Sequence, residues 1–150
     1  MGILFTTSKG PGAGARNLCR CLAEMIPGAI CENRGEKSVE DVVGRARLFG
    51  KGRICLIHGK AGKPSEMHFA RVRANSWGWL EPVFTIKSAK LCKPICQEPE
   101  SITLKGAAAE EWRSLLAVGE EEGGEATAAC AKGSFKLMLG KKTVLELVFG

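Results

Sequence analysis

This sequence of 150 residues contains no tyrosine, only two histidines and no long run of apolar side chains. No apolar stretch approaches the roughly 20 residues that a membrane-spanning helix requires, so we expect no membrane partner. The apolar stretch near the N-terminus, Ile3 to Phe5, is too short for the core of a signal peptide, and Lys9 soon interrupts it. We therefore expect the protein to stay in the cytoplasm, where it is made.

The two histidines lack the neighbours that catalysis or metal binding would require. Neither His58 nor His68 belongs to a Glu-x-x-His or His-x-x-x-His pattern. We interpret both as structural side chains on or near strands. No order of Ser, His and Asp stands out either, so a hydrolase has no support and we expect no enzyme.

Seven cysteines occur at positions 19, 21, 31, 55, 92, 96 and 130. An odd number in a chain of this size favours reduced thiols over a disulfide framework. Neither Cys-x-Cys at 19–21 nor Cys-x₃-Cys at 92–96 has the paired Cys-x₂-Cys spacing of a zinc site. We expect structural thiols, with no metal and no other cofactor.

The chain does have a large apolar fraction and an uneven charge. Apolar residues make up 45% of it, which is enough for one ordinary domain or two small fused halves. Residues 1–90 carry 15 Lys and Arg against 7 acids, whereas residues 91–150 carry 7 against 9. A polyanion is the natural partner of the first region, because phosphate contacts supply affinity without reading sequence. Ordinary solvated surface charge is the alternative.

Local signals predict an alternation of strands and helices, which is typical of an α/β fold. The predicted strands are at residues 3–7, 29–31, 53–58, 67–73, 79–86, 102–104, 135–139 and 143–149. The predicted helices are at residues 13–26, between Ser38 and Gly50, and at about 107–118. Between these elements we expect a basic loop at 59–64, a turn at 75–78, a boundary near 88–99 and an acidic loop at 120–124.

The second predicted helix has a clear start and a clear apolar side. Ser38 and Asp41 have the spacing of a capping box, in which each side chain binds the other residue's backbone N–H. The side expected to be buried consists of Val42, Ala46 and Phe49.

The glycine-rich turn at residues 10–14 joins the first strand to the first helix. Free N–H groups and the positive dipole end of such a helix favour a phosphate. The turn lacks the spacing of a P-loop, and it fails Gly-x-Gly-x-x-Gly because Ala15 stands where a glycine is needed. Three interpretations stay open: a tight turn alone, phosphate contact with RNA, and a nucleotide site.

Cations and one hydroxyl near this turn and two later ones are the candidate RNA-binding residues. They are Ser8, Lys9, Arg16, Arg20, Arg34, Lys60 and Lys63. Lys60 and Lys63 lie in a Gly-rich loop, which suits flexible contacts to a phosphate backbone. The alternatives are a helix cap for Ser8, carbonyl binding for Arg34, and simple solvation for Arg16 and Arg20.

Trp77 and Trp79 stand on either side of Gly78. Both rings could stack on the bases of single-stranded RNA. We favour the other interpretation, in which one ring packs in the core and its neighbour shields a turn, because the chain has no tyrosine and few aromatic residues.

An ordered set of motifs runs through residues 3–90. It comprises Thr6-Thr-Ser-Lys-Gly-Pro-Gly12, a helix ending in Ile-Pro-Gly-Ala, Asn-Arg-Gly35, Ser38 at the start of a second helix, an apolar strand at 54–57, the loop Gly59-Lys-Ala-Gly-Lys-Pro64 and a strand at 83–86. This set resembles the Brix domain, and the short chain is similar to the stand-alone archaeal Brix proteins, which resemble the Imp4 and Rpf ribosome-assembly factors. Where the family usually has Arg, this chain has Lys9, which acts as a point charge.

The resemblance implies an α/β protein of two fused halves, each like the anticodon-binding domain of class II aminoacyl-tRNA synthetases. Residues 1–150 would form one Brix domain, with a basic N-terminal half at 1–90 and a smaller C-terminal half at 91–150. The implied function is to bind pre-rRNA and assist rRNA processing and ribosomal subunit assembly without catalysis. The implied partners are rRNA and ribosome-assembly proteins, with no small-molecule substrate. A protein-interaction adaptor without RNA binding is the alternative, and a nucleotide-dependent enzyme that uses the turn at 10–14 is a third.

Overall fold

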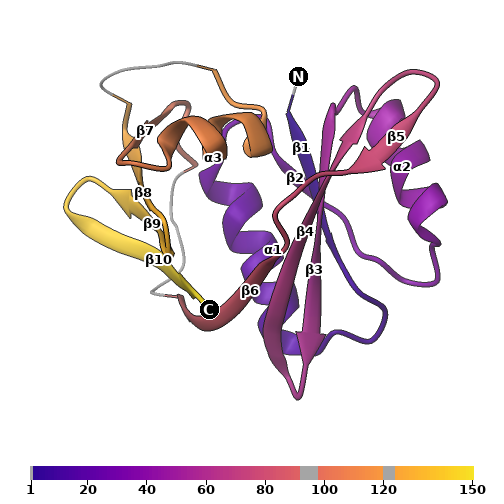
Figure 1. Cartoon of the computed structure of the whole chain (residues 1–150), viewed down its shortest axis with the longest axis horizontal. Coiled ribbons are helices and arrows are strands. Elements are labelled where there is room, and N and C mark those ends of the chain that lie inside the picture. The colour runs from indigo at the N-terminus through magenta and orange to yellow at the C-terminus, as the bar shows by residue number, and fades with distance from the viewer. Residues whose placement is uncertain (1, 92–97, 120–123) are drawn as a thin grey trace.

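The computed structural model describes residues 2–91, 98–119 and 124–150. Within them, ten strands and three helices follow one another in a mixed α/β order (Figure 1). In chain order they are β1 (Ile3–Thr7), α1 (Ala13–Met25), β2 (Ile30–Cys31), α2 (Val39–Leu48), β3 (Arg53–Lys60), β4 (Lys63–Val72), β5 (Trp77–Trp79), β6 (Phe84–Leu91), β7 (Ile102–Lys105), α3 (Ala109–Leu116), β8 (Ala126–Ala131), β9 (Ser134–Leu139) and β10 (Lys142–Phe149). The predicted α/β class is confirmed.

The strands form one continuous sheet in the order β2-β1-β3-β4-β6-β10-β9-β8-β7, and β5 pairs with β4 outside this path. Strand β6 joins the two parts of the sheet. Its first residue, Phe84, lies opposite Met67 of β4, and its last residue, Leu91, lies opposite Leu145 of β10. The sheet is therefore continuous from the first strands of the chain to the last.

The same strand order occurs twice, on either side of the β6–β10 pair. In both β1-β3-β4-β6 and β7-β8-β9-β10, the first two strands are parallel and the others are antiparallel to their neighbours. We call the described residues 2–91 the N-terminal region and those from 98 to 150 the C-terminal region. The connection between the parallel strands contains α1, β2 and α2 in the N-terminal region, but only α3 among the described residues of the C-terminal region.

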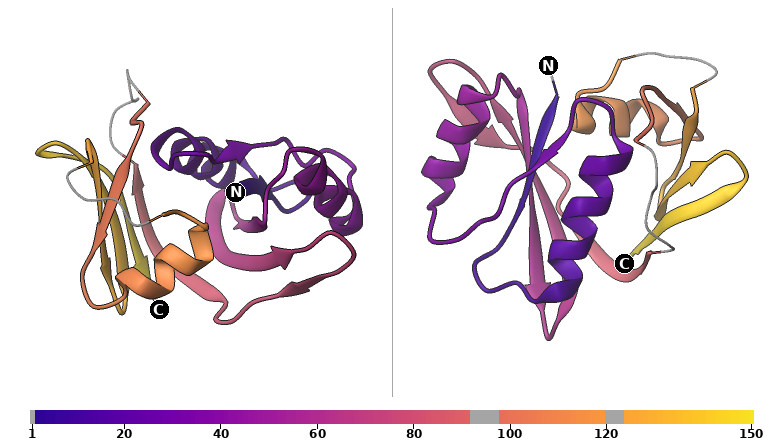
Figure 2. Two further views of the ribbon diagram at one scale, coloured as in Figure 1. Left: turned by 90° about the horizontal axis from the view of Figure 1, so that it is seen from above. Right: turned by 180° about the vertical axis from the view of Figure 1, so that it is seen from behind.

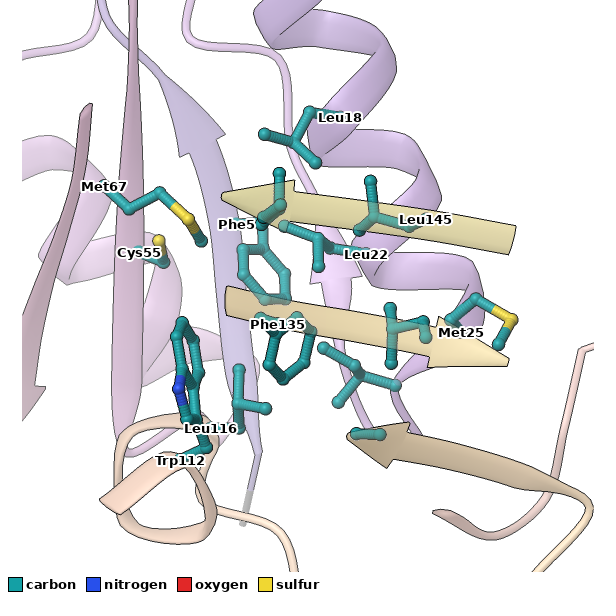
Figure 3. Close-up of a cluster of buried hydrophobic side chains, with 14 of the residues drawn as sticks. Phe5, Leu18, Leu22, Met25, Cys55, Met67, Trp112, Leu116, Phe135 and Leu145 are labelled. Atoms are coloured by element: carbon teal, nitrogen blue, oxygen red, sulfur yellow. The ribbon is translucent and has the colours of Figure 1, made fainter. Parts of the chain in front are cut away.

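One large core lies between the two regions. Helix α1 packs against the N-terminal strands and also faces the C-terminal strands, so that Leu22 and Leu145 belong to one apolar cluster (Figures 1 and 3). Trp112 of α3 is 1% exposed, and its ring centroid lies 4.7 Å from that of Phe84 and 4.4 Å from that of Phe135. Because Phe84 is on β6 and Phe135 on β9, this one side chain contacts both regions.

A smaller core covers the other face of the N-terminal strands. Val42, Val43 and Ala46 of α2 pack there, and Figure 2 shows this helix on the side of the sheet away from the C-terminal strands. The predicted capping box is confirmed, since Asp41 N–H donates to the Ser38 side chain and Ser38 N–H donates to Asp41. The prediction that Phe49 is buried is wrong. Phe49 caps the end of α2, is 47% exposed, and lies under the guanidinium of Arg45.

Several predicted boundaries change. The expected basic loop at 59–64 is a tight hairpin, because β3 continues to Lys60 and β4 begins at Lys63. The expected turn at 75–78 and strand at 79–86 are also wrong: β5 already begins at Trp77, and a break with a cis peptide at Pro82 separates it from β6. Strand β8 was not predicted, since its small Ala and Thr side chains give no strong apolar run. Cys92 and Cys96, which we expected to be structural thiols, and most of the predicted acidic loop lie outside the described residues.

Candidate functional site

The glycine-rich turn before α1 packs directly on the tip of the β3–β4 hairpin. Gly14 N–H donates to the Gly62 carbonyl over 3.2 Å, and a Cβ atom on Gly14 would lie 2.6 Å from that oxygen. Gly12 has a φ of 83°, and its Cβ atom would lie 2.9 Å from Gly62 Cα. The turn is thus built for close backbone contact, and one of the donors that we expected to be free for a phosphate is already used within the protein.

Ser8 and Lys9, which precede this turn, have different environments. Ser8 is half-buried, and its hydroxyl accepts from Gly59 N–H over 3.2 Å. Helix α1 has no side-chain cap, so the alternative of a cap by Ser8 is wrong, and this hydroxyl instead ties β1 to the hairpin. Lys9 is exposed next to Gly10. Its contact with RNA stays a prediction.

A groove of about 640 Å³ lies between the start of α1, the hairpin tip and β6. Three lysines line it, Lys60 and Lys63 from the hairpin and Lys87 from β6, and we call it the lysine groove. The side of α1 contributes Gly14 and Asn17. Figure 2 shows the N-terminal end of α1 beside the hairpin tip. No carboxylate occurs among the described residues that line this groove, so its charge is wholly positive.

A second pocket of about 560 Å³ lies between α1 and β2, and we call it the arginine pocket. It is lined by Thr7, Arg16, Cys19, Arg20, Cys31, Glu32 and Asn33. Among these lining residues, Glu32 is the one carboxylate. It forms an ion pair with Arg45 of α2, with 2.6 Å between Arg45 Nη2 and Glu32 Oε1. Because Arg45, which does not line the pocket, neutralises Glu32, the charges of Arg16 and Arg20 give the pocket a net positive charge.

The lysine groove and the arginine pocket lie on different sides of helix α1. Arg20 Nη2 donates to Asn17 Oδ1 over 2.7 Å, and Asn17 in turn lines the lysine groove. Among the described residues, the five cations of the two hollows make no ion pair. These side chains are therefore available to an anionic partner that crosses α1.

Four of these five cations were predicted from the sequence, and Lys87 was not. The structure brings Lys60 and Lys63 together at the hairpin tip, and Arg16 and Arg20 together on α1. The signal for Lys87 was its place in β6, where Phe84 and Ile86 are buried and Thr85 and Lys87 are exposed. That alternation indicates an outward-facing lysine, but only the fold brings it next to the hairpin tip.

Arg34 has a structural role. It is 8% exposed, its Nε donates to the Lys37 carbonyl over 2.6 Å, and its Nη1 donates to the Thr7 carbonyl over 2.9 Å. The alternative of carbonyl binding by Arg34 is confirmed. This arginine holds the end of β1 against the segment that leads into α2.

Four rings form a row across β3, β4 and β5. The centroids of His58 and His68 are 4.6 Å apart, those of His68 and Trp79 are 6.0 Å apart, and those of Trp79 and Trp77 are 5.3 Å apart. Trp77 packs against the small core under α2, whereas Trp79 is 48% exposed. The interpretation that one ring packs in the core is therefore only partly right, because Trp77 lies at the edge of the smaller core.

The two histidines contact each other, and one of them contacts a carboxylate. His68 Nε2 lies 3.3 Å from Glu66 Oε1. Burial, with the nearby His68 adding to it, lowers the pKa of His58. No group of three His, Cys, Asp or Glu side chains gathers to hold a metal within the part of the chain that the structure describes. None of the helices found there has both the length and the apolarity to cross a bilayer.

No family model matches the chain. Sequence comparison nevertheless finds relatives that share one name. The chain is 31% identical over 78 residues to a protein of Pyrococcus horikoshii and 30% identical over 78 residues to one of Thermococcus kodakarensis. Both are named "Probable Brix domain-containing ribosomal biogenesis protein". The match covers 52% of this chain but only 35% and 38% of those relatives, so the chain matches little more than a third of their length.

Comparisons of structure cover nearly the whole chain. A probable ribosomal biogenesis protein from Aeropyrum pernix K1 superposes with a TM-score of 0.78 at 20% identity, over 99% of this chain and 94% of that one. An archaeal Imp4-like protein superposes with a TM-score of 0.70 at 19% identity, over 97% of this chain and 95% of that one. None of these four proteins is named as an enzyme. The chain has the fold of archaeal Imp4-like ribosomal biogenesis proteins, and its predicted resemblance to Brix domain proteins is confirmed.

Proposed function

We propose that this protein assists ribosome biogenesis by binding pre-rRNA across helix α1, with the lysine groove on one side and the arginine pocket on the other. It supports rRNA processing and subunit assembly by holding RNA in a productive shape, without chemistry of its own. The names of its relatives support the role in ribosome biogenesis.

The observation that carries RNA binding is the composition of the lysine groove. Three ammonium groups meet there with no carboxylate among the described lining residues, beside backbone of the hairpin tip. Such a groove attracts any phosphate chain, because each neutralised phosphate releases condensed counterions.

The arginine pocket adds a different kind of contact. Guanidinium groups bind phosphates through two parallel hydrogen bonds and also stack on bases, which lysines do not do. Asn33 and Thr7 beside Arg16 and Arg20 supply polar groups at the same place. Selectivity would then come from the shape of the RNA and from unpaired bases that enter this pocket.

The repeated strand order supports the proposed domain organisation. We infer that residues 1–90 and 91–150 are two related halves of one Brix domain, each like a class II anticodon-binding domain, and that the protein acts in the cytoplasm. The support is the shared order of parallel and antiparallel pairs in β1-β3-β4-β6 and β7-β8-β9-β10.

The experiment replaces the three groove lysines by alanine and measures binding to rRNA fragments over a range of salt concentrations. If all three meet phosphates, the slope of log affinity against log salt should fall by about three units. The matched control replaces Lys132, Lys141 and Lys142, three exposed lysines of the C-terminal region, by alanine. Equal loss in both variants would contradict the groove as the binding site, and no binding by the parent protein would favour the adaptor.

A further inference from the structure

Cys19 and Cys31 form a pair of thiols that the predicted structural role does not explain. Cys19 lies on α1 and Cys31 on β2, and their Sγ atoms are 2.6 Å apart. A covalent S–S bond is about 2.05 Å long, so a shift of well under 1 Å would join the two sulfurs. The two elements are packed neighbours, and neither has to unfold for this to happen.

The two thiols differ in their access to solvent. Both line the arginine pocket, but Cys19 is 1% exposed, whereas Cys31 is only half-buried. The hydrogen bond from the Cys19 thiol lowers the pKa of Cys31, and the positive charge of Arg20 lowers it further, while the same hydrogen bond raises the pKa of Cys19. Cys31 is thus the accessible nucleophile, and Cys19 is the thiol held behind it.

We propose that Cys19 and Cys31 are a thiol-modification site that forms a reversible disulfide by exchange with a small-molecule disulfide of the oxidised glutathione type. The Cys31 thiolate attacks one sulfur of that molecule, its S–S bond breaks, and the first small thiolate leaves. Cys19 Sγ then attacks Cys31 Sγ, the mixed disulfide breaks, and the second small thiolate leaves with the Cys19 proton. Two protein thiols are oxidised and one small disulfide is reduced to two thiols.

Two other cysteines of the described chain show why this pair is selective. Cys55 is fully buried, and burial raises the pKa of its thiol well above the ordinary value. Cys130 is 1% exposed, and burial raises its pKa to about 11. Both thiols therefore stay protonated and out of reach of a small disulfide.

The proposed disulfide requires only Cys19 and Cys31, and it does not depend on RNA binding. A bond between them would tie α1 to β2 on the floor of the arginine pocket and would close a short loop of chain. Closing a loop restricts the unfolded chain, so the oxidised protein should melt at a higher temperature than the reduced protein.

The test incubates the folded protein with oxidised glutathione, blocks the remaining thiols and digests the protein with trypsin. Cleavage after Arg16, Arg20 and Arg34 puts Cys19 in peptide 17–20 and Cys31 in peptide 21–34. We expect these two peptides as one species, two hydrogen atoms lighter than their sum, which separates when a reductant is added. Fragment masses assign the link to Cys31 or to Cys21, which shares its peptide.

Two variants provide the controls. C31S should lose the linked species, whereas C21S, in the same peptide, should keep it. The proposal is overturned if Cys19 and Cys31 of the folded parent both stay free to react with the blocking agent, if Cys31 stops at a mixed disulfide with glutathione, or if Cys19 is linked to another cysteine.

Discussion

The two regions of the molecule repeat one strand order, yet they differ in what joins their parallel strands. In the N-terminal region the connection between β1 and β3 contains α1, β2 and α2, and it carries the arginine pocket and one wall of the lysine groove. In the C-terminal region the connection between β7 and β8 contains α3 among the described residues, and its Trp112 turns inward to the shared core.

The charges follow the same division. Residues 1–90 carry 15 Lys and Arg against 7 acids, and residues 91–150 carry 7 against 9. The C-terminal strands cover α1 and complete its core, while the cations of the lysine groove and the arginine pocket stand on the N-terminal region. The repeated strands therefore supply a common frame, and the candidate site comes from the longer connection of the N-terminal region.

The first prediction tests whether the two regions share one core. Trp112→Ala should lower the free energy of unfolding by about 3–5 kcal/mol, because the ring contacts Phe84 and Phe135 across the junction and leaves a cavity. Urea unfolding followed by circular dichroism would measure it. Two separate transitions in the parent protein would contradict a shared core.

The second prediction concerns the glycine-rich turn of the N-terminal region. Gly14→Val should lower the free energy of unfolding by about 1–3 kcal/mol, because its side chain must push the Gly62 carbonyl away. The control is Gly44→Ala, on an open side of α2, which should change stability little or raise it by up to about 1 kcal/mol. Equal midpoints for Gly14→Val and the parent in urea would show that the turn does not need the close contact.

The third prediction concerns the arginine pocket. Replacing Arg16 and Arg20 by alanine should lower the salt slope of rRNA-fragment binding by about two units. Replacing both by lysine keeps the charge, so the slope should persist while affinity falls, because the paired hydrogen bonds of guanidinium are lost. Filter binding over a salt series would measure both. If the lysine variant binds as tightly as the parent, the pocket acts through charge alone.

The smallest effect is expected at Lys9. Lys9→Ala should change the free energy of unfolding by no more than about 0.5 kcal/mol, as is usual for an exposed side chain. It should lower the salt slope by about one unit if this lysine meets one phosphate. Thermal melting and the same salt series would separate the two effects. An unchanged slope would mean that the turn serves only the architecture.

Local sequence signals predicted most elements, because their causes lie within a few residues. The capping box at Ser38 and Asp41 and the first strand at residues 3–7 are examples. The prediction that Phe49 is buried was wrong because helical spacing does not show that α2 ends at Leu48, which leaves Phe49 at the exposed end of the helix. Strand β8 was not predicted because it consists of small side chains, whose burial depends on neighbours far along the chain.

The candidate site was predictable in composition but not in arrangement. The turn and the cations around it were visible in the sequence. Three other features depend on the fold: the hydrogen bond from Gly14 N–H to Gly62, the burial of Arg34 and the position of Lys87 beside the hairpin. The contact between Cys19 and Cys31 has the same origin, since a helix and a strand bring these two thiols together.

The most direct test of the central claim compares charge reversal in the two regions. One variant changes Arg16, Arg20, Lys60 and Lys63 to glutamate, and the other changes the exposed Lys105, Lys132, Lys141 and Lys142 to glutamate. Both lower the net charge equally, so fluorescence anisotropy with labelled rRNA fragments at one salt concentration isolates the effect of position. We expect the first variant to lose RNA binding while it stays folded, and the second variant to keep most of its RNA binding. Equal binding by the two variants would contradict it.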